Sequence, residues 1–257
     1  MAIITLLTDA GESDHYVAAI KARILSLSPQ ANIVDISHQI RPFDIGHGAF
    51  VLRSVFRDFP AGTVHLVGVD SAGDRGEGQI LLKLEGHYFL GADNGLLSLL
   101  SEQMPESVWT LGDPNAIITF PEKEVLAPAA ARLSTGADPS SVGTAASEFK
   151  RFIDRQVKAT RRQITGNVIR VDHYGNLITN IPKQAFDVLS KGRNFTIAFG
   201  GEKFRRIHAT YNHADQGECF LIFNELQFLE IGIYKGNASE LLGLGYDSVV
   251  NVVFDES

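Results

Sequence analysis

The chain has 257 residues, of which 44% are hydrophobic and 21% are charged, and its formal net charge is −7. This composition excludes collagen, coiled coil and extended disorder, and a negative net charge without a basic tract argues against an electrostatic nucleic-acid binder. The single cysteine, Cys219, excludes an intramolecular disulfide framework and a cysteine-rich zinc site. No apolar run reaches the roughly 18 residues of a membrane span, and residues 1–9 lack the basic region of a secretory signal. We therefore predict a soluble cytoplasmic protein without membrane or nucleic-acid partners, suited to a cationic or zwitterionic small ligand.

Strand-like and helix-like segments alternate through the first half of the chain. In order, we expect a strand at 2–8, a helix at 14–27, a strand at 31–36, a helix at 45–56, a strand at 63–69, a hairpin of strands 79–84 and 87–90, a helix at 96–100, a strand at 107–111 and a helix at 125–133. Strands separated by helices need crossover connections, so this order predicts an α/β sandwich with a mainly parallel sheet. In such sheets ligands bind beyond the carboxyl ends of the strands. Four polar residues follow apolar runs at such places: Asp9, Asp14, Asp70 and Asn94.

Strand-like segments dominate the second half, at 166–171, 177–180, 195–199, 204–208, 219–223, 229–234 and 248–254. Short strands at regular spacing are typical of a small antiparallel barrel or sandwich. We therefore predict an N-terminal α/β domain over residues 1–160 and a smaller C-terminal β-barrel-like domain over residues 163–257. The basic stretch 149–165 is interpreted as a solvated helix connecting the domains, over about residues 145–162, rather than as a polyanion-binding surface.

The sequence contains no Gly-x-Ser-x-Gly elbow, no P-loop and no His-Glu-x-x-His motif. The most metal-like set is His38, Asp44 and His47, but its spacing matches no standard zinc pattern, and we expect no metal there. Polar residues at sharp turns are the remaining candidates. Asp9 stands between a strand and a helix, where a carboxylate either caps the helix or accepts the two hydroxyls of a ribose. The residues alone favour the helix cap, and ribose binding is the alternative.

Three further segments combine turn residues with candidate ligands. Segment 93–95 is a turn signal first and a binding site second, and segment 236–238 is interpreted as an ordinary tight turn. Segment 172–181 concentrates polar and turn-forming residues inside an otherwise apolar strand, which turn chemistry alone explains poorly.

Seven motifs stand in order along the chain: Leu-Thr-Asp-x-Gly-x-x-Asp at 7–14, Asp-Ile-Ser-His at 35–38, Phe-Pro-x-Gly-Thr-Val at 59–64, Asp-Asn-Gly-Leu-Leu at 93–97, Ala-Pro-Ala-Ala-Ala at 127–131, Asp-His-Tyr-Gly-Asn-Leu-Ile-Thr-Asn-Ile at 172–181 and Leu-Glu-Ile-x-x-x-x-Gly-Asn-Ala at 229–238. Together they resemble the S-adenosyl-L-methionine (SAM) hydroxide adenosyltransferases, relatives of the bacterial fluorinase and chlorinase. Each motif is weak by itself, but the seven cover essentially the whole chain.

The resemblance implies a fold, an assembly and a reaction. It implies an α/β N-terminal domain, a β-rich C-terminal domain, and a homotrimer that binds SAM between the N-terminal domain of one subunit and the C-terminal domain of its neighbour. The implied reaction is SAM hydrolysis, in which water displaces methionine from the ribose C5′ to give adenosine and L-methionine. It needs no metal or other cofactor.

The resemblance also implies roles for individual residues. Asp9 corresponds to the carboxylate that binds the ribose hydroxyls, Asp14 to an acid near the methionine, and Asp172 to the one that receives the methionine ammonium group. Asn176 corresponds to the amide that reads the adenine edge, together with the backbone around Ala238. The aromatic rings of Phe43 and Tyr211 are expected to stack on the ligand, and Asn94 and Asn237 are assigned to substrate binding with them. Asp70 corresponds to the first of three water-handling residues and is our catalytic candidate.

The other two water-handling residues depart from the family pattern. The family's Arg falls on Glu77, with Arg75 reachable only by a two-residue shift, and its His falls on Pro121, which has neither an ionisable side chain nor an N–H. Asp70 or Glu122 could accept the proton of the water, although Glu122 and Arg75 by themselves are interpreted as surface charges. Two hypotheses follow: an enzyme, namely a SAM hydrolase, or a catalytically silent SAM- or adenosine-binding protein of the same fold.

Overall fold

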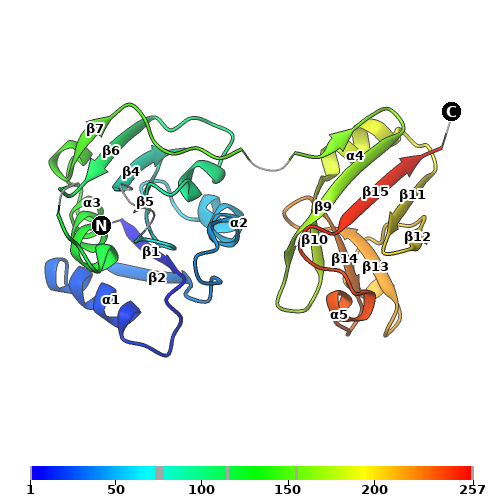
Figure 1. Ribbon diagram of the computed structural model, residues 1–257, viewed down its shortest axis with the longest axis horizontal. Coiled ribbons are helices and arrows are strands. Elements are labelled where there is room, and N and C mark those ends of the chain that lie inside the picture. The colour runs from blue at the N-terminus through cyan, green and yellow to red at the C-terminus, as the bar shows by residue number, and fades with distance from the viewer. Residues whose placement is uncertain (1, 73–77, 114–115, 154–155, 256–257) are drawn as a thin grey trace. The chain divides into compact units, whose positions relative to one another are not determined.

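The computed structural model describes residues 2–72, 78–113, 116–153 and 156–255. The chain divides into two compact units, Met1–Asp154 and Arg155–Ser257 (Figure 1). This division lies six residues before the predicted boundary at residue 160. In the described part of the chain, no helix is both long and apolar enough to span a membrane.

Unit 1 is built on a seven-stranded sheet. Its strands are β1 (Ile3–Thr8), β2 (Asn32–Ser37), β3 (Val64–Gly68), β4 (Gln79–Leu84), β5 (His87–Ala92), β6 (Ser107–Leu111) and β7 (Gly143–Ala146), in the order β2-β1-β3-β5-β4-β6-β7. The pairs β1–β2, β1–β3 and β3–β5 are parallel, and the three pairs made by β4 and β6 are antiparallel. Five of the seven strands therefore run in one direction, which confirms the predicted α/β class with a mainly parallel sheet.

Helices cover both faces of this sheet (Figure 1). On one face lie α1 (Tyr16–Leu27) and α3 (Ala127–Ser134), together with a π-helical turn, η3 (Glu122–Leu126); on the other lie α2 (Ile45–Val55) and the 3₁₀ turns η1 (Phe56–Asp58) and η2 (Leu96–Leu99). Neighbouring strand residues face opposite cores: Leu66 packs with α1 and α3, and Val67 packs with α2. β3 is buried along its whole length and is apolar apart from His65, as expected of a strand covered on both faces.

Unit 2 is a curled antiparallel sheet, which confirms the predicted β-rich domain. Its strands are β8 (Lys158–Ala159), β9 (Gln163–Val171), β10 (Leu177–Pro182), β11 (Phe195–Phe199), β12 (Glu202–Phe204), β13 (Cys219–Phe223), β14 (Phe228–Ile233) and β15 (Val249–Phe254). They follow the order β12-β11-β15-β9-β10-β14-β13, with β8 paired to β9. Three short helical segments accompany them: α4 (Lys183–Ser190), η5 (Tyr211–His213) and α5 (Ala238–Leu242). The core inside the curl is aliphatic and aromatic, with Ile164, Leu221 and Ile231 fully buried.

The helix predicted over residues 145–162 is wrong. The described residues of this segment are irregular apart from the end of β7 and the short β8. Distant side chains take up its backbone donors, since the Lys150 N–H binds Asp93 Oδ1 at 2.7 Å and the Phe152 N–H binds Ser98 Oγ at 2.8 Å. The Phe152 ring lies against Gly95, where a Cβ would come within 2.4 Å of it. These long-range contacts replace the i to i−4 hydrogen bonds of a helix.

Candidate functional site

The carboxylate of Asp9 organises the carboxyl edge of the unit 1 sheet. Asp9 directly follows β1, and its N–H binds the carbonyl of Gly68 at the end of β3, at 3.1 Å. Its Oδ2 accepts two backbone N–H groups, from Phe43 at 2.9 Å and from Asp70 at 3.2 Å. These bonds fill the two lone pairs of Oδ2, so Oδ1 is the oxygen placed to accept hydroxyls of a ligand.

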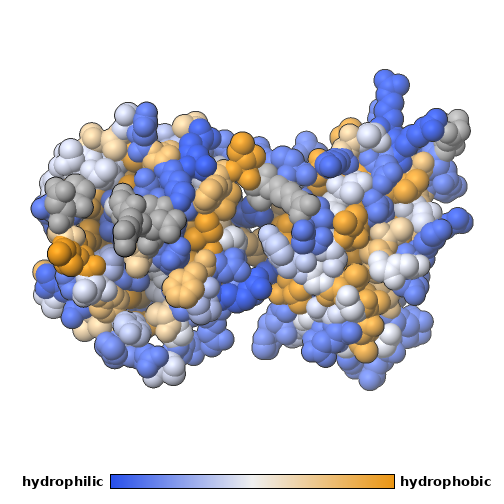
Figure 2. Space-filling view, in the orientation of Figure 1, coloured by the Kyte–Doolittle hydropathy of each residue, from blue (hydrophilic) through white to orange (hydrophobic). Residues whose placement is uncertain are grey.

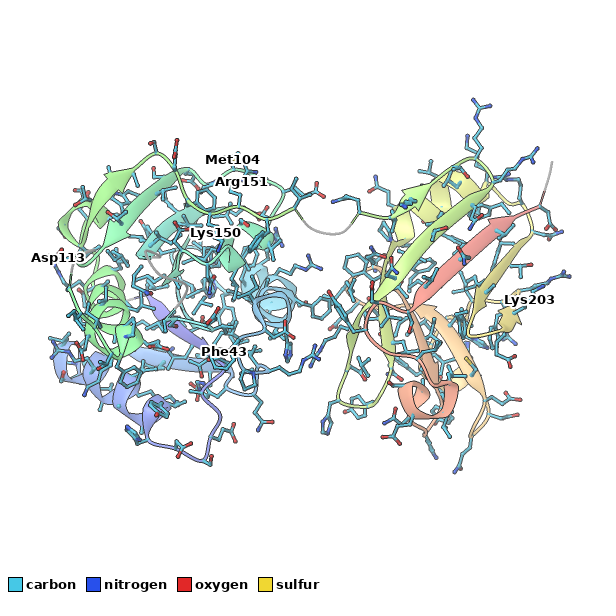
Figure 3. The ribbon with its side chains drawn as sticks, in the orientation of Figure 1. Phe43, Met104, Asp113, Lys150, Arg151 and Lys203 are labelled. Atoms are coloured by element: carbon cyan, nitrogen blue, oxygen red, sulfur yellow. The ribbon has the colours of Figure 1, made fainter. Side chains whose placement is uncertain are left out.

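Both residues that donate to Asp9 have left-handed backbone conformations. Phe43 has φ of 64° and Asp70 has φ of 48°, in a region that bulky side chains seldom adopt. The Phe43 ring is 76% exposed on the loop before α2 (Figure 3). Strained, non-glycine backbone of this kind persists where the surrounding structure holds it, and it concentrates at binding sites. The Asp9 carboxylate is part of what holds it here.

Asn94 connects β5 to the same edge. It is 4% exposed, and its Nδ2 donates to the carbonyls of Val69 at 2.9 Å and Asp70 at 3.2 Å. Its Oδ1 accepts the N–H of Leu96, which begins the η2 turn. Asn94 is thus a positioning residue that fixes the backbone of Asp70. We call Asp9, Phe43, Asp70 and Asn94 the Asp9 group.

Asp14 is separate from this group. It lies in the exposed loop before α1, and among the described residues no hydrogen bond joins it to Asp9. Arg75 and Glu77 lie outside the described residues. Pro121 is the N-cap of the π-helical turn η3, and its side chain has no hydrogen-bond donor or acceptor.

Glu122 is not the surface charge that the sequence suggested. Its side chain is half-buried against Gly68, where a Cβ would stand 3.0 Å from Glu122 Cγ and 3.4 Å from Oε1. Burial raises the pKa of its carboxyl and the negative charge of Asp9 raises it further, while its own backbone N–H and the nearby Ser71 hydroxyl oppose the rise. The prediction failed because the wide turn of η3 directs Glu122 inward, while Lys123 and Glu124 beside it are exposed.

In unit 2, a tight turn joins β9 to β10 and holds two of the predicted residues. Asp172 Oδ1 accepts the Asn176 N–H at 2.8 Å, and Oδ2 accepts Asn176 Nδ2 at 3.2 Å. The Asn176 amide is buried over Gly232 of β14, where a Cβ would meet its Oδ1 at 2.5 Å. Asp172 therefore orients Asn176 in addition to any role with a ligand.

The turn packs directly on the start of α5. Gly175 has φ of 83°, and a Cβ at this position would lie 2.0 Å from Asn237 Oδ1, so only glycine fits. Asn237 caps α5 by accepting the Glu240 N–H at 3.2 Å. Ala238 follows it and is fully buried.

A cavity of about 730 Å³ opens beside this turn. It is lined by Asp172, Tyr174, Asn176, Tyr211, Phe220, Ile233, Tyr234, Lys235, Gly236 and Asn237. Four of the predicted binding residues therefore line one cavity, and its volume and aromatic lining suit a ligand of nucleoside size. Their contacts with a ligand stay a prediction.

Phe220 and Tyr234 line the cavity but were not predicted from the sequence, and Glu230, which acts on the predicted residue Tyr211, was missed as well. The Tyr211 ring meets Phe220 edge to face, with centroids 5.4 Å apart, and burial and the charge of Glu230 raise the pKa of its hydroxyl to about 12. Glu230 is 3% exposed, accepts Asn224 Nδ2 at 2.9 Å, and burial raises its own pKa. A carboxylate inside the apolar strand β14 was the signal that could have identified it.

The metal-like set His38, Asp44 and His47 takes part in hydrogen bonds within the protein. His38 Nδ1 lies 2.9 Å from Thr8 Oγ1, and His47 Nδ1 accepts the Arg41 N–H at 3.1 Å. Asp44 Oδ1 caps α2 by accepting the His47 N–H. Within the described ranges, no three His, Cys, Asp or Glu side chains are grouped to hold a metal.

Comparison with known proteins identifies the family of this chain. Sequence models of the SAM hydroxide adenosyltransferase N-terminal and C-terminal domains match residues 4–143 and 166–251. The chain belongs to the SAM hydroxide adenosyltransferase family. This confirms the resemblance found in the sequence motifs.

The chain is similar over most of its length to proteins that carry a name or have a solved structure. An (R)-S-adenosyl-L-methionine hydrolase of Methanocaldococcus jannaschii is 30% identical over 98% of this chain and 96% of that protein. A fluorinase of Nocardia brasiliensis is 29% identical over 74% of each chain. A crystal structure of an uncharacterized conserved protein from Thermotoga maritima has a TM-score of 0.89 at 29% identity, covering 98% of this chain and all of that one.

Proposed function

We propose that this protein is a SAM hydrolase that transfers water to the ribose C5′ and releases adenosine and L-methionine. The observation that carries the proposal is the near full-length similarity to proteins named (R)-S-adenosyl-L-methionine hydrolase, at 26–30% identity. The geometry supports it, because Asp9 Oδ1 is placed to accept ribose hydroxyls and the unit 2 cavity has the volume and lining for a nucleoside.

SAM hydrolysis requires the protein to position the attacking water and to supply one base. Methionine leaves a sulfonium as a neutral thioether, so its departure needs no acid. The remaining demands are an in-line water held apart from bulk solvent and an acceptor for its proton. Carboxylates at the Asp9 edge can meet the second demand, so we propose that the reaction uses no metal or other cofactor.

We further propose a cytoplasmic homotrimer that binds SAM between the Asp9 group of one subunit and the unit 2 cavity of its neighbour. Each unit by itself carries part of a nucleoside site, and large apolar side chains such as Phe43, Tyr174 and Tyr246 are exposed. Apolar residues also reach the surface of both units on the face drawn in Figure 2. Exposed apolar surface of this kind favours assembly.

Incubation of the purified protein with SAM, with adenosine and methionine followed by chromatography, tests the proposal. The wild type should release both products in equal amounts, and Asp70→Asn should release them about 100-fold more slowly, because Asp70 is proposed to position the attacking water. Asparagine tolerates the left-handed backbone at this position, so the change isolates the carboxylate.

The replacement of the family's His by Pro121 favours a second candidate function, a SAM- or adenosine-binding protein without turnover. Saturable binding of SAM by calorimetry, with no adenosine above the uncatalysed background, would establish the binder and refute the hydrolase.

A further inference from the structure

Glu122 stands at the one π-helical turn assigned among the described residues. The Ala127 N–H binds the carbonyl of Glu122, five residues back, and this wide turn joins Pro121 to α3. Such turns are rare and recur at functional sites. Here the turn leaves Lys123 and Glu124 exposed and brings the Glu122 side chain to the carboxyl edge of the sheet.

The Glu122 carboxylate lies over the strand ends that carry the Asp9 group. Its Cγ and Oε1 lie 3.0 and 3.4 Å from the place that a Cβ of Gly68 would take, and Gly68 is the last residue of β3, whose carbonyl accepts the Asp9 N–H. A side chain at position 68 would occupy the same space, so Gly68 is what allows Glu122 to reach this edge. Asp70 follows two residues later.

The surroundings of Glu122 make it a stronger base than an exposed glutamate. It is half-buried, and among the described residues the charge that acts on it is that of Asp9, from the end of β1. Both effects raise its pKa, while its own backbone and the nearby Ser71 hydroxyl moderate the rise. A carboxylate whose pKa is raised towards the working pH takes a proton from water more readily. Asp9, by contrast, has Oδ2 committed to two backbone N–H groups.

We infer that Glu122 is the base that accepts the proton of the attacking water, with its carboxylate delivered over Gly68 to the Asp9 group by the η3 turn. The inference rests on the proposed SAM hydrolysis. In that step the water oxygen forms a bond to C5′, and the C5′–S bond breaks with its electron pair going to sulfur. The water proton passes to Glu122. The products are adenosine and methionine, whose sulfur is now a neutral thioether, and Glu122 later releases the proton to solvent.

The test is Glu122→Gln, which keeps the shape of the side chain and removes the base. We expect kcat for adenosine formation to fall about 100-fold or more, while SAM affinity measured by calorimetry changes less than about threefold. In the wild type kcat should fall with decreasing pH as Glu122 becomes protonated, and Glu122→Gln should lack this acidic limb.

Glu124→Gln is the matched control, because it makes the same charge change two residues away on an exposed side chain. It should keep the wild-type rate and the wild-type pH profile. If Glu122→Gln unfolds at a lower temperature than the wild type, Glu122→Asp replaces it and should show a reduced rate with the acidic limb retained.

Three results would overturn the inference. Wild-type kcat and an unchanged pH profile in Glu122→Gln would show that another group accepts the proton. An equal loss of affinity and kcat would make Glu122 a binding or structural residue. A wild type that is folded and binds SAM but forms no adenosine would refute the proposed hydrolysis itself, which the comparison of variants alone would not.

Discussion

Each unit places a carboxylate at a strand end and holds it with N–H groups, but the two carboxylates differ in how many of their oxygens those groups occupy. In unit 1, two N–H groups from distant loops converge on one oxygen of Asp9. In unit 2, both oxygens of Asp172 bind Asn176, four residues away in the same turn. Asp9 thus keeps one oxygen for a ligand, whereas Asp172 serves first to shape its own turn.

The groups that surround Asp9 and Asp172 differ as well. Asp9 lies near a second, half-buried carboxylate whose pKa is raised, at the edge of a mainly parallel sheet. Asp172 borders a cavity of about 730 Å³ with aromatic walls. Polar, strained surroundings suit proton transfer and hydroxyl binding, and an aromatic cavity suits recognition of a flat ring. Under the proposed function, unit 1 therefore suits ribose binding and proton transfer, and unit 2 suits recognition of the adenine ring.

The largest effect should follow from Asp9→Ala. Two hydrogen bonds from ribose hydroxyls to a carboxylate contribute about 1.5–3 kcal/mol each, so the affinity for adenosine, measured by calorimetry, should fall about 100-fold or more. The Phe43 and Asp70 N–H groups would also lose their shared acceptor. Asp14→Ala is the control, because adenosine lacks the methionine that Asp14 is expected to approach. Unchanged adenosine affinity in Asp9→Ala would break the ribose assignment.

Much of this arrangement could be predicted from the sequence, because the rules involved are local. Apolar runs separated by helical segments specify the strands, and polar residues after those runs specify the carboxyl edge where Asp9, Asp70 and Asn94 meet. The turn around Asp172 and Asn176 was visible as polar residues within an apolar strand.

The features that the sequence did not predict depend on contacts between distant segments. Glu122 was predicted to be an exposed charge because nothing in its local sequence specifies a π-helical turn that packs against Gly68. The segment through Lys150 and Phe152 read as a helix because its backbone partners, Asp93 and Ser98, lie more than 50 residues away. Left-handed backbone at Phe43 also has no local sequence signal.

A smaller effect, confined to unit 2, is expected from Gly175→Ala. The new Cβ would lie 2.0 Å from Asn237 Oδ1 at a φ of 83°, so both the turn and the start of α5 must shift. We expect the free energy of unfolding to fall by about 3 kcal/mol, from left-handed strain and overpacking together. Chemical denaturation would measure this loss, and affinity for adenosine should fall with it.

Gly192→Ala separates the two causes. Gly192 has a similar φ of 79°, but no heavy atom lies within 4 Å of the site of its Cβ. Its substitution should cost only the strain of about 1–2 kcal/mol and leave adenosine affinity unchanged. Equal losses in the two variants would mean that close packing of the turn on Asn237 does not shape the cavity.

The smallest effect concerns a buried histidine in the core of unit 1. It should make the free energy of unfolding of unit 1 more sensitive to acid than that of unit 2. His65 is fully buried, with Nδ1 2.7 Å from Thr5 Oγ1 and Nε2 3.2 Å from His87 Nδ1. Burial, with a smaller contribution from His87, lowers the pKa of His65 from 6.5 to about 3. Above pH 6.5 the imidazole is neutral in the folded and unfolded states, and its contribution to stability is fully present. As the pH falls from 6.5 towards 3 only the unfolded state takes up the proton, so stability is lost by up to about 1.4 kcal/mol per pH unit.

Urea unfolding at pH 7.5 and 5.5 would measure this loss through the fluorescence of Trp109, the single tryptophan, which lies on β6 of unit 1. The wild type should be less stable at pH 5.5 by about 1 kcal/mol from this residue. His65→Gln cannot take up the proton and should flatten the pH dependence, whereas His173→Gln, in the exposed turn of unit 2, should leave it unchanged. If His65→Gln kept the pH dependence of the wild type, the loss of stability in acid would have to arise from groups other than His65. The buried histidine would then not explain a difference in acid sensitivity between the two units.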